Sequence, residues 1–128
     1  LAGCGLAGCG DPYAEVKAGM SPLEAERFDR GRRMATPCWT CHDITGEAAK
    51  LGPSLSGLFG RRVGSLAGYG YSDAFRAADF VWNEREIGAF LADPQGFLPG
   101  TRMLSPGVRD REQRAELLFF LRHATRPR

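Results

Sequence analysis

The sequence predicts an all-α fold in one domain. Three segments begin with residue patterns typical of helix N-termini, and no segment of useful length alternates apolar and polar residues as a half-buried strand does. A long glycine-rich stretch separates the first of these segments from the second. The chain has 128 residues, of which 43% are hydrophobic and 25% charged, enough to close one modest core.

The first helix is expected to begin at Pro22 and to run to about Pro37. Ser21 is a favourable N-cap residue, proline is favourable at the first helical position, and Glu24 stands three residues after the cap. A stripe of small and apolar residues with a glycine at its centre would let another helix approach closely. The stripe consists of Phe28, Gly31 and Ala35.

A second helix is expected to begin after Asn83 and to end at Pro94, with Ile87, Phe90 and Leu91 on one face. Asp110 and Gln113 mark the start of the last helix. Its inward stripe is expected to comprise Leu117, Leu118, Leu121 and Ala124. Two further apolar residues, Phe119 and Phe120, exceed what one stripe requires and are expected to pack on a neighbour, whereas His123 is expected in solvent.

Residues 51–70 contain too many glycines for a helix and are expected to form a long ordered loop. In a compact domain, such a loop is usually functional. The sequence therefore directs attention to this loop as part of a binding site.

The segment CWTCH places two thiols, Cys38 and Cys41, three residues apart and an imidazole, His42, directly after the second. A zinc site would need a second suitable pair of ligands, and a thioredoxin-like dithiol would need a βαβ pattern around it. Neither is present in the sequence. The remaining interpretation is covalent attachment of a c-type haem, in which the thiols add to the vinyl groups and the histidine ligates the iron.

Several motifs, taken in order, resemble class I cytochromes c of the mitochondrial and bacterial c2 kind over roughly residues 28–125. They are CWTCH, GPSLSGLFGRRVG, GYGYSDAF, a tryptophan at position 82, FLPGTRM and an amphipathic C-terminal helix. The resemblance implies the cytochrome c fold, with N- and C-terminal helices packed together around one covalently bound haem and with long ordered loops.

The resemblance also implies one haem c attached through Cys38 and Cys41, with His42 and Met103 as the iron ligands. Pro53 would accept a hydrogen bond from the other imidazole nitrogen of His42, which fixes the tautomer and raises the basicity of the ligand. From its residue type alone, Met103 could instead be an ordinary apolar loop residue.

Four further residues resemble those that contact the haem propionates. Arg61, Tyr71 and Trp82 would donate hydrogen bonds to the inner propionate, and Thr101 would lie near the methionine sulfur and the second propionate. Because Arg62 follows Arg61, the sequence does not decide which guanidinium points inward. Trp82 could equally be an ordinary core residue.

The function implied by this resemblance is that of a one-electron carrier rather than an enzyme, because His/Met ligation leaves no open position for a small-molecule substrate. Membrane redox complexes would be donor and acceptor: a quinol-oxidising complex, a terminal oxidase or a photosynthetic reaction centre. One alternative is a fixed haem subunit of a larger respiratory or photosynthetic complex, and another is a haem peroxidase-like enzyme. The net charge of +2 and the scattered basic residues do not indicate nucleic-acid binding.

The N-terminal sequence LAGCGLAGCG contains two copies of LAGC, which resembles the lipobox of bacterial lipoproteins. Lipid attachment at Cys4 or Cys9 would place the protein on the periplasmic side of the bacterial cytoplasmic membrane. A small disulfide between the two cysteines is the alternative. The expected organisation is a lipobox-like N-terminus and tether over residues 1–20, followed by the cytochrome c domain over residues 21–128.

Overall fold

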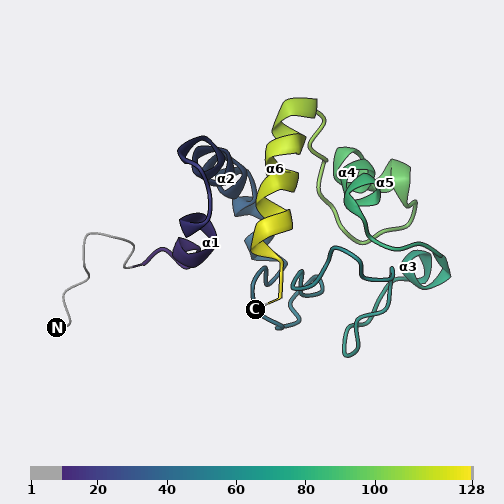
Figure 1. Ribbon diagram of the computed structural model, residues 1–128. Helices are drawn as coiled ribbons and strands as arrows, with labels where there is room; N and C mark the ends of the chain where they lie inside the picture. The colour runs from purple at the N-terminus through teal and green to yellow at the C-terminus, as the bar shows by residue number, and fades with distance from the viewer. Residues whose placement is uncertain (1–9, 128) are drawn as a thin grey trace.

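The computed structural model describes residues 10–127, which form a helical domain (Figure 1). The expected sites at Cys4 and Cys9 lie outside the described residues. The helices are α1 (Ala14–Ala18), α2 (Pro22–Met34), the 3-10 helix η1 (Thr36–Thr40), α3 (Asp73–Ala77), α4 (Glu84–Ala92), α5 (Pro94–Phe97) and α6 (Arg111–Ala124). Among these residues, β pairing is limited to an isolated antiparallel bridge between Arg62 and Val81, so the all-α prediction is confirmed.

Helix α2 begins where the sequence predicts, with reciprocal capping bonds. The Glu24 backbone N–H donates to Ser21 Oγ at 3.2 Å, and the Ser21 N–H donates to Glu24 Oε1 at 3.3 Å. The helix ends at Met34, earlier than the expected end near Pro37. Because proline lacks a backbone N–H and crowds the preceding turn, the chain tightens into η1 instead of continuing as α-helix.

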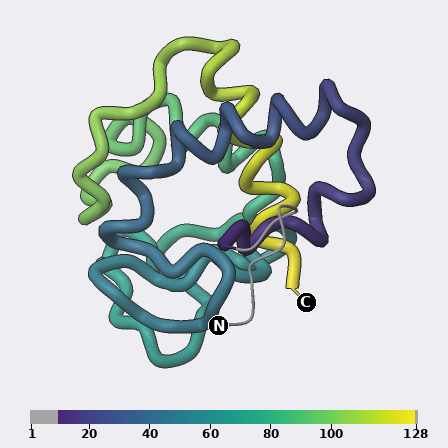
Figure 2. Tube along the Cα trace, turned by 90° about the vertical axis from the view of Figure 1, so that its left-hand side faces the viewer, coloured from purple at the N-terminus to yellow at the C-terminus, as the bar shows by residue number. Residues whose placement is uncertain are grey.

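Helices α2 and α6 pack against each other (Figure 2), and the first core lies in and around this contact. It comprises Tyr13, Phe28, Ala35, Ile44, Leu117, Phe120, Leu121 and Ala124. The predicted stripe of Phe28, Gly31 and Ala35 is buried in this contact. A Cβ atom at Gly31 would lie 2.2 Å from the backbone oxygen of Glu116 and 2.6 Å from Phe120 Cβ. The absence of a side chain at Gly31 therefore sets how closely the two helices approach.

On α6, the prediction for the phenylalanines is wrong for Phe120, which is fully buried inside the domain. Its ring lies 5.0 Å from the ring of Phe28. Phe120 falls three residues after Leu117, on the same face as Leu121 and Ala124, whereas the expected stripe member Leu118 is only half-buried. Phe119 is half-buried beneath the guanidinium of Arg27, 4.5 Å from its ring centroid.

Residues 11–20 pack onto the domain rather than forming part of a tether. Tyr13 has only 4% of its surface exposed, and its ring lies 5.4 Å from each of the rings of Phe28 and Phe120. Val16 and Met20 pack against the same core. The folded body therefore includes α1, while the division of the chain at residue 20 stays a prediction.

Asp11 connects this segment to α2, and its environment gives a testable pH dependence. The hydrogen bond from the Tyr13 N–H, at 2.9 Å, and the charges of Arg32 and Lys17 hold the pKa of the Asp11 carboxyl below its ordinary value of 3.8. A group with a depressed pKa in the folded state stabilises the fold above its unfolded-state pKa, and this contribution disappears as the pH falls through the folded-state pKa.

We therefore expect Asp11→Asn to remove part of the acid-induced loss of stability. Urea midpoints measured between about pH 5 and pH 2 should fall less steeply in this variant than in the wild type. Asp73→Asn is the control, because Asp73 and its ion-pair partner Arg76 are both largely exposed. Parallel curves for Asp11→Asn and the wild type would contradict the prediction.

A second core lies between α4 and the loops before and after it. It comprises Leu58, Val63, Trp82, Ile87 and Phe90, with Met103 packed against it. Helix α4 is capped as predicted by Asn83, whose Oδ1 accepts hydrogen bonds from the Arg85 and Glu86 N–H groups. This core supports both the 51–70 loop and the loop that carries Met103.

The 51–70 segment has no helix, as predicted. Gly57, Gly60, Gly64 and Gly68 have positive φ angles, which only glycine adopts readily. No helix within residues 10–127 has both the length and the apolar character needed to span a bilayer.

Candidate haem site

The two thiols and the imidazole of CWTCH lie on one tight turn that continues from α2. The Cys38 N–H donates to the Ala35 carbonyl at 2.8 Å, and the His42 N–H donates to the Cys38 carbonyl at 2.9 Å. Both cysteines are half-buried, and neither is in a disulfide. Burial raises the pKa of the Cys38 thiol. The turn thus gathers two free sulfur atoms and one imidazole within five residues.

His42 is held by the 51–70 loop. Its Nδ1 lies 2.7 Å from the carbonyl oxygen of Pro53, as the resemblance implied. Burial lowers the pKa of His42, which favours the neutral imidazole. Since a carbonyl oxygen can only accept, Nδ1 carries the proton in this bond and the lone pair remains on Nε2. The imidazole is therefore prepared to ligate a metal through Nε2.

Gly52 lies against the His42 ring. A Cβ atom at position 52 would lie 2.3 Å from Cε1 and 2.7 Å from Nδ1 of the imidazole. The Gly52 N–H donates to the Cys41 carbonyl at 2.7 Å, so the backbone cannot move away without breaking this bond. Glycine is required here because the imidazole occupies the space of a side chain.

We expect Gly52→Ala to displace His42 and to destabilise the domain by about 1–3 kcal/mol, the usual cost of overpacking. The loss of a well-aligned bond to Pro53 should also shift the reduction potential of the protein with haem attached. Guanidinium unfolding and a redox titration would measure the two effects.

Gly70→Ala is the matched control for that variant. No heavy atom lies within 4 Å of a Cβ built at Gly70, and its φ angle does not require glycine. Its stability and potential should remain close to those of the wild type. Equal behaviour of the two variants would contradict the role assigned to Gly52.

Met103 lies on the loop between α5 and α6, and hydrogen bonds hold this loop on both sides of the residue. The Met103 N–H donates to Thr101 Oγ1 at 3.2 Å, and Gln95 Nε2 donates to the Thr101 carbonyl at 2.7 Å. The Arg102 guanidinium donates to the Gly70 carbonyl. Thr101 is buried and Met103 is half-buried, so the thioether belongs to the interior side of a fixed loop.

The structure distinguishes the two neighbouring arginines that the sequence could not. Arg61 donates to the carbonyl oxygens of Ser54 at 2.8 Å and Ser56 at 2.5 Å, and burial lowers its pKa. Arg62 instead pairs with Asp79, and both of these side chains are largely exposed. Arg61 is therefore the inward-facing residue of the pair.

Tyr71 and Trp82 are both buried, as a role beside a haem group requires. The phenol of Tyr71 interacts with the guanidinium of Arg61, and its oxygen accepts a hydrogen bond from the Leu66 N–H at 3.2 Å. Trp82 lies within the second core, with its ring 5.3 Å from that of Phe90. Arg61 and Tyr71 thus bring polar hydrogen-bonding groups to a largely apolar interior.

Sequence reasoning overlooked two residues that support the site. Ser54 is buried, donates to the Gly46 carbonyl and accepts from the Ser56 N–H at 3.1 Å, so it joins the loop after His42 to the 51–70 loop. Gln95 fixes Thr101 through the bond described above. The sequence did not indicate a structural role for Ser54 or Gln95, because serine and glutamine in loops are usually exposed to solvent.

The donor set fits a haem c. Free sulfur atoms at Cys38 and Cys41 can form the two thioether bonds, His42 offers Nε2, and Met103 offers a soft thioether. Arg61 and Tyr71 can donate hydrogen bonds to a buried carboxylate. Without such donors, removing the carboxylate from water would be costly. Gly52 leaves no room for a side chain beside the His42 ring, as expected for an imidazole held in one orientation.

Comparison with known proteins identifies the family of the chain. Residues 28–125 match the model of the Cytochrome c family. A cytochrome c of Guizotia abyssinica is 38% identical over 114 residues, which cover 88% of this chain and 97% of the relative. A cytochrome c2 of Blastochloris viridis is 34% identical over 108 residues, which cover 84% and 85%.

A solved structure with a similar fold is cytochrome cH from Methylobacterium extorquens. It aligns with a TM-score of 0.69 and 32% sequence identity. The alignment covers 73% of this chain and 95% of that protein.

Proposed function

The chain belongs to the cytochrome c family and carries one covalently attached haem c, and on that premise we propose that it passes single electrons between membrane redox complexes with His42 and Met103 as its iron ligands. The observation that carries the proposal is the bond from His42 Nδ1 to the Pro53 carbonyl, which leaves Nε2 as the metal-binding atom. When bound, the haem supplies a reversible one-electron iron couple.

The residues of the chain would tune and protect that couple. The Pro53 carbonyl would keep the imidazole basic, and the soft sulfur of Met103 would favour the ferrous state and raise the potential. Arg61 and Tyr71 would provide hydrogen bonds to a propionate. The apolar side chains of the two cores would limit the access of water to the site.

A carrier with both axial positions filled has no place for a small substrate, and this is the reason for proposing electron transfer over catalysis. The test is a redox titration of the purified protein together with its reaction with cyanide. A reversible titration with one electron per haem and slow cyanide binding are expected. Immediate cyanide binding by the wild type would indicate an open position and would favour the peroxidase-like alternative.

We further propose attachment to the periplasmic side of a bacterial cytoplasmic membrane through a lipidated cysteine, at Cys4 or Cys9. The support is the doubled LAGC sequence. Several acyl chains anchor a protein far more stably than one myristoyl chain does. The donor and acceptor would then be integral complexes of that membrane: a quinol-oxidising complex on one side, and a terminal oxidase or photosynthetic reaction centre on the other.

Intact-mass measurement of the native protein tests the anchor. An acylated protein should show the mass of the lipid. It should also remain with membranes after washing at about 1 M salt, where the Debye length is only about 3 Å and attraction between charges alone would not hold it. Cys4→Ser and Cys9→Ser should separate the two candidate sites, because only replacement of the true site should release the haem domain. A mass lower by two hydrogens would support the Cys4–Cys9 disulfide instead.

A further inference from the structure

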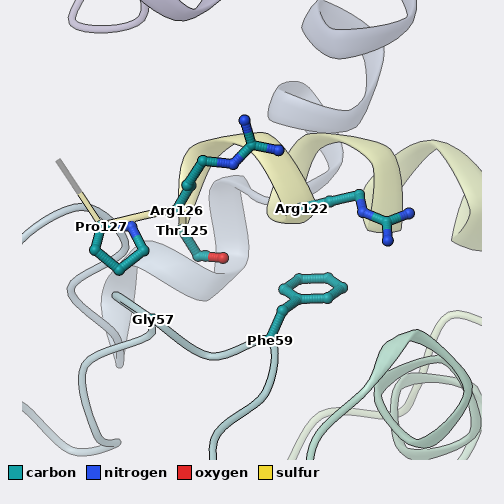
Figure 3. Close-up of a pocket in the computed structure, with 6 residues that line it drawn as sticks. All are labelled: Gly57, Phe59, Arg122, Thr125, Arg126 and Pro127. Atoms are coloured by element: carbon teal, nitrogen blue, oxygen red, sulfur yellow. The ribbon is translucent and has the colours of Figure 1, made fainter.

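Helix α1 and the C-terminal end of α6 form one continuous face of the domain. A hollow between them is lined by residues of both elements: Glu15, Val16, Gly19, His123, Arg126 and Pro127. A second hollow beside it, shown in Figure 3, shares Arg126 and Pro127 and is also bordered by Arg122 and Phe59. We call this surface, around the two hollows, the α1/α6 face.

The N-terminal border of this face is fixed to the body of the protein. Lys17 Nζ lies 2.8 Å from Asp29 Oδ1 on α2, and Arg32 of α2 lies 3.0 Å from Asp11 Oδ1. The buried ring of Tyr13 lies between these two ion pairs in sequence and is inserted beside Phe28. From Asp11 onward, the chain therefore moves with the domain.

The length of chain before Asp11 limits how far the domain can move from a lipid anchor. Only Gly10 separates Cys9 from Asp11, and two extended residue steps span about 7 Å. If Cys4 carries the lipid, seven steps span about 25 Å. With the lipid at Cys9, Asp11 and the start of α1 would therefore stay within about one Debye length of the headgroups, which is about 8 Å at physiological ionic strength.

The exposed charges of this face are mixed, but its two arginines carry guanidinium groups that bind phosphate oxygens well. Arg122 lies in the last turn of α6 and Arg126 lies just after its end (Figure 3), and both are exposed. Glu15 lies on the rim of one hollow, and Glu84 lies 3.5 Å from Arg122. His123 lies between the two arginines in sequence and packs on Phe119, with 4.7 Å between the ring centroids.

We propose that the α1/α6 face rests on the phosphate headgroups of the bilayer, and that residues 11–20 act as a rigid strap that sets the orientation of the domain. The inference rests on the lipid attachment proposed above. A strap of this kind makes the carrier a membrane-bound body with one face always toward the lipid, rather than a domain that turns freely on a long tether.

The two lysines of the chain provide an internal measurement of this orientation. Lys17 lies on α1, and Lys50 lies on the loop after His42, where its Nζ donates to the Trp39 carbonyl at 3.2 Å. The lipidated holoprotein would be added to vesicles of phosphatidylethanolamine and phosphatidylglycerol and treated with a bulky, membrane-impermeant amine reagent. Labelling of Lys17 should be several-fold slower on vesicles than in detergent, whereas labelling of Lys50 should be unchanged.

A longer tether should remove the protection without releasing the protein. Insertion of about twenty Gly/Ser residues between Gly10 and Asp11 adds a mean reach of about 25 Å. Lys17 should then react on vesicles nearly as fast as in detergent, while sedimentation with vesicles is retained. Tyr13→Ala, which removes the ring that holds the strap, should act in the same direction.

Charge variants test the contribution of the headgroups. In the protein with its native tether, Arg122→Gln with Arg126→Gln should reduce the protection of Lys17 on vesicles that contain phosphatidylglycerol. The matched control is Arg62→Gln with Arg76→Gln, two exposed arginines on other elements, which should leave that protection unchanged.

Two results would overturn the orientation while leaving the anchor intact. One is equal labelling of Lys17 and Lys50 on vesicles by a protein that sediments with them. The other is selective protection of Lys50, which would place a different face on the lipid. Failure of the native protein to sediment would contradict the lipid attachment itself and, with it, the inference.

Discussion

Replacing Met103 with alanine should abolish the weak sulfur-to-iron absorption band at the red end of the visible spectrum of the ferric protein. The soft thioether stabilises ferrous iron, and axial ligands move haem potentials over a range of about 0.8 V, so the reduction potential should fall by an amount on the order of a few tenths of a volt. Optical spectroscopy and a redox titration would measure both effects.

Met34→Ala is the control for the variant at Met103. Met34 is also a half-buried methionine, but it packs against the first core near the end of α2. The Met34→Ala variant should be less stable than the wild type but should keep the sulfur-to-iron absorption band and the reduction potential. A variant at Met103 that keeps the wild-type band would show that another group ligates the iron.

Gly31→Ala should destabilise the protein strongly, because it adds a methyl group inside the contact between α2 and α6. The new Cβ would lie 2.2 Å from the Glu116 backbone oxygen, an atom that can move only if the two helices separate. Overpacking costs about 1–3 kcal/mol and occasionally more, and we expect a value of about 3 kcal/mol because the opposing atom is backbone. Chemical denaturation would measure the change in the free energy of unfolding.

Gly88→Ala is the matched control on α4. Its Cβ would meet only the tip of the Leu118 side chain, at 3.3 Å, and alanine is the better helix former by about 1 kcal/mol. Its stability should equal or exceed that of the wild type. An unfolding midpoint of Gly31→Ala equal to that of the wild type would contradict the close helix contact.

The helix starts could be predicted from sequence because their signals are local. Ser21, Asn83 and Asp110 each cap the expected helix through bonds to residues two or three positions away. The stop of α2 was less well predicted, because proline restricts the preceding turn without fixing where α-helical geometry changes to 3-10 geometry. The short helices α3 and α5 were not predicted, because four or five residues give too little periodicity.

The packing of residues 11–20 could not be predicted, because it depends on contacts with distant parts of the chain. Tyr13 is buried by Phe28 and Phe120, and the residues near position 13 do not indicate that these rings are its partners.

The haem attachment site, in contrast, could be predicted from the sequence, because the spacing of the cysteines and the histidine in CWTCH is specific to this chemistry. The inward direction of Arg61 required the structure, because neighbouring arginines in a loop have no periodicity to separate them. The iron-ligand role of Met103 stays a prediction.

The pairing of α2 with α6 also bears on the order of events when the protein is made. Arg30 and Glu116, which form an ion pair across this contact, lie 86 positions apart. Closing a loop of that length costs about 4 kcal/mol of chain entropy. Because α6 is synthesised long after α2, the Phe28 ring can meet Tyr13 early but lacks its partner Phe120 until α6 has been made.

The two attachment cysteines follow α2 directly and are half-buried once the domain has closed. On the open chain, both sulfur atoms are accessible to the machinery that forms the thioether bonds. We therefore expect haem attachment to precede the docking of α6, so that α6 closes the domain over a chain already carrying its cofactor.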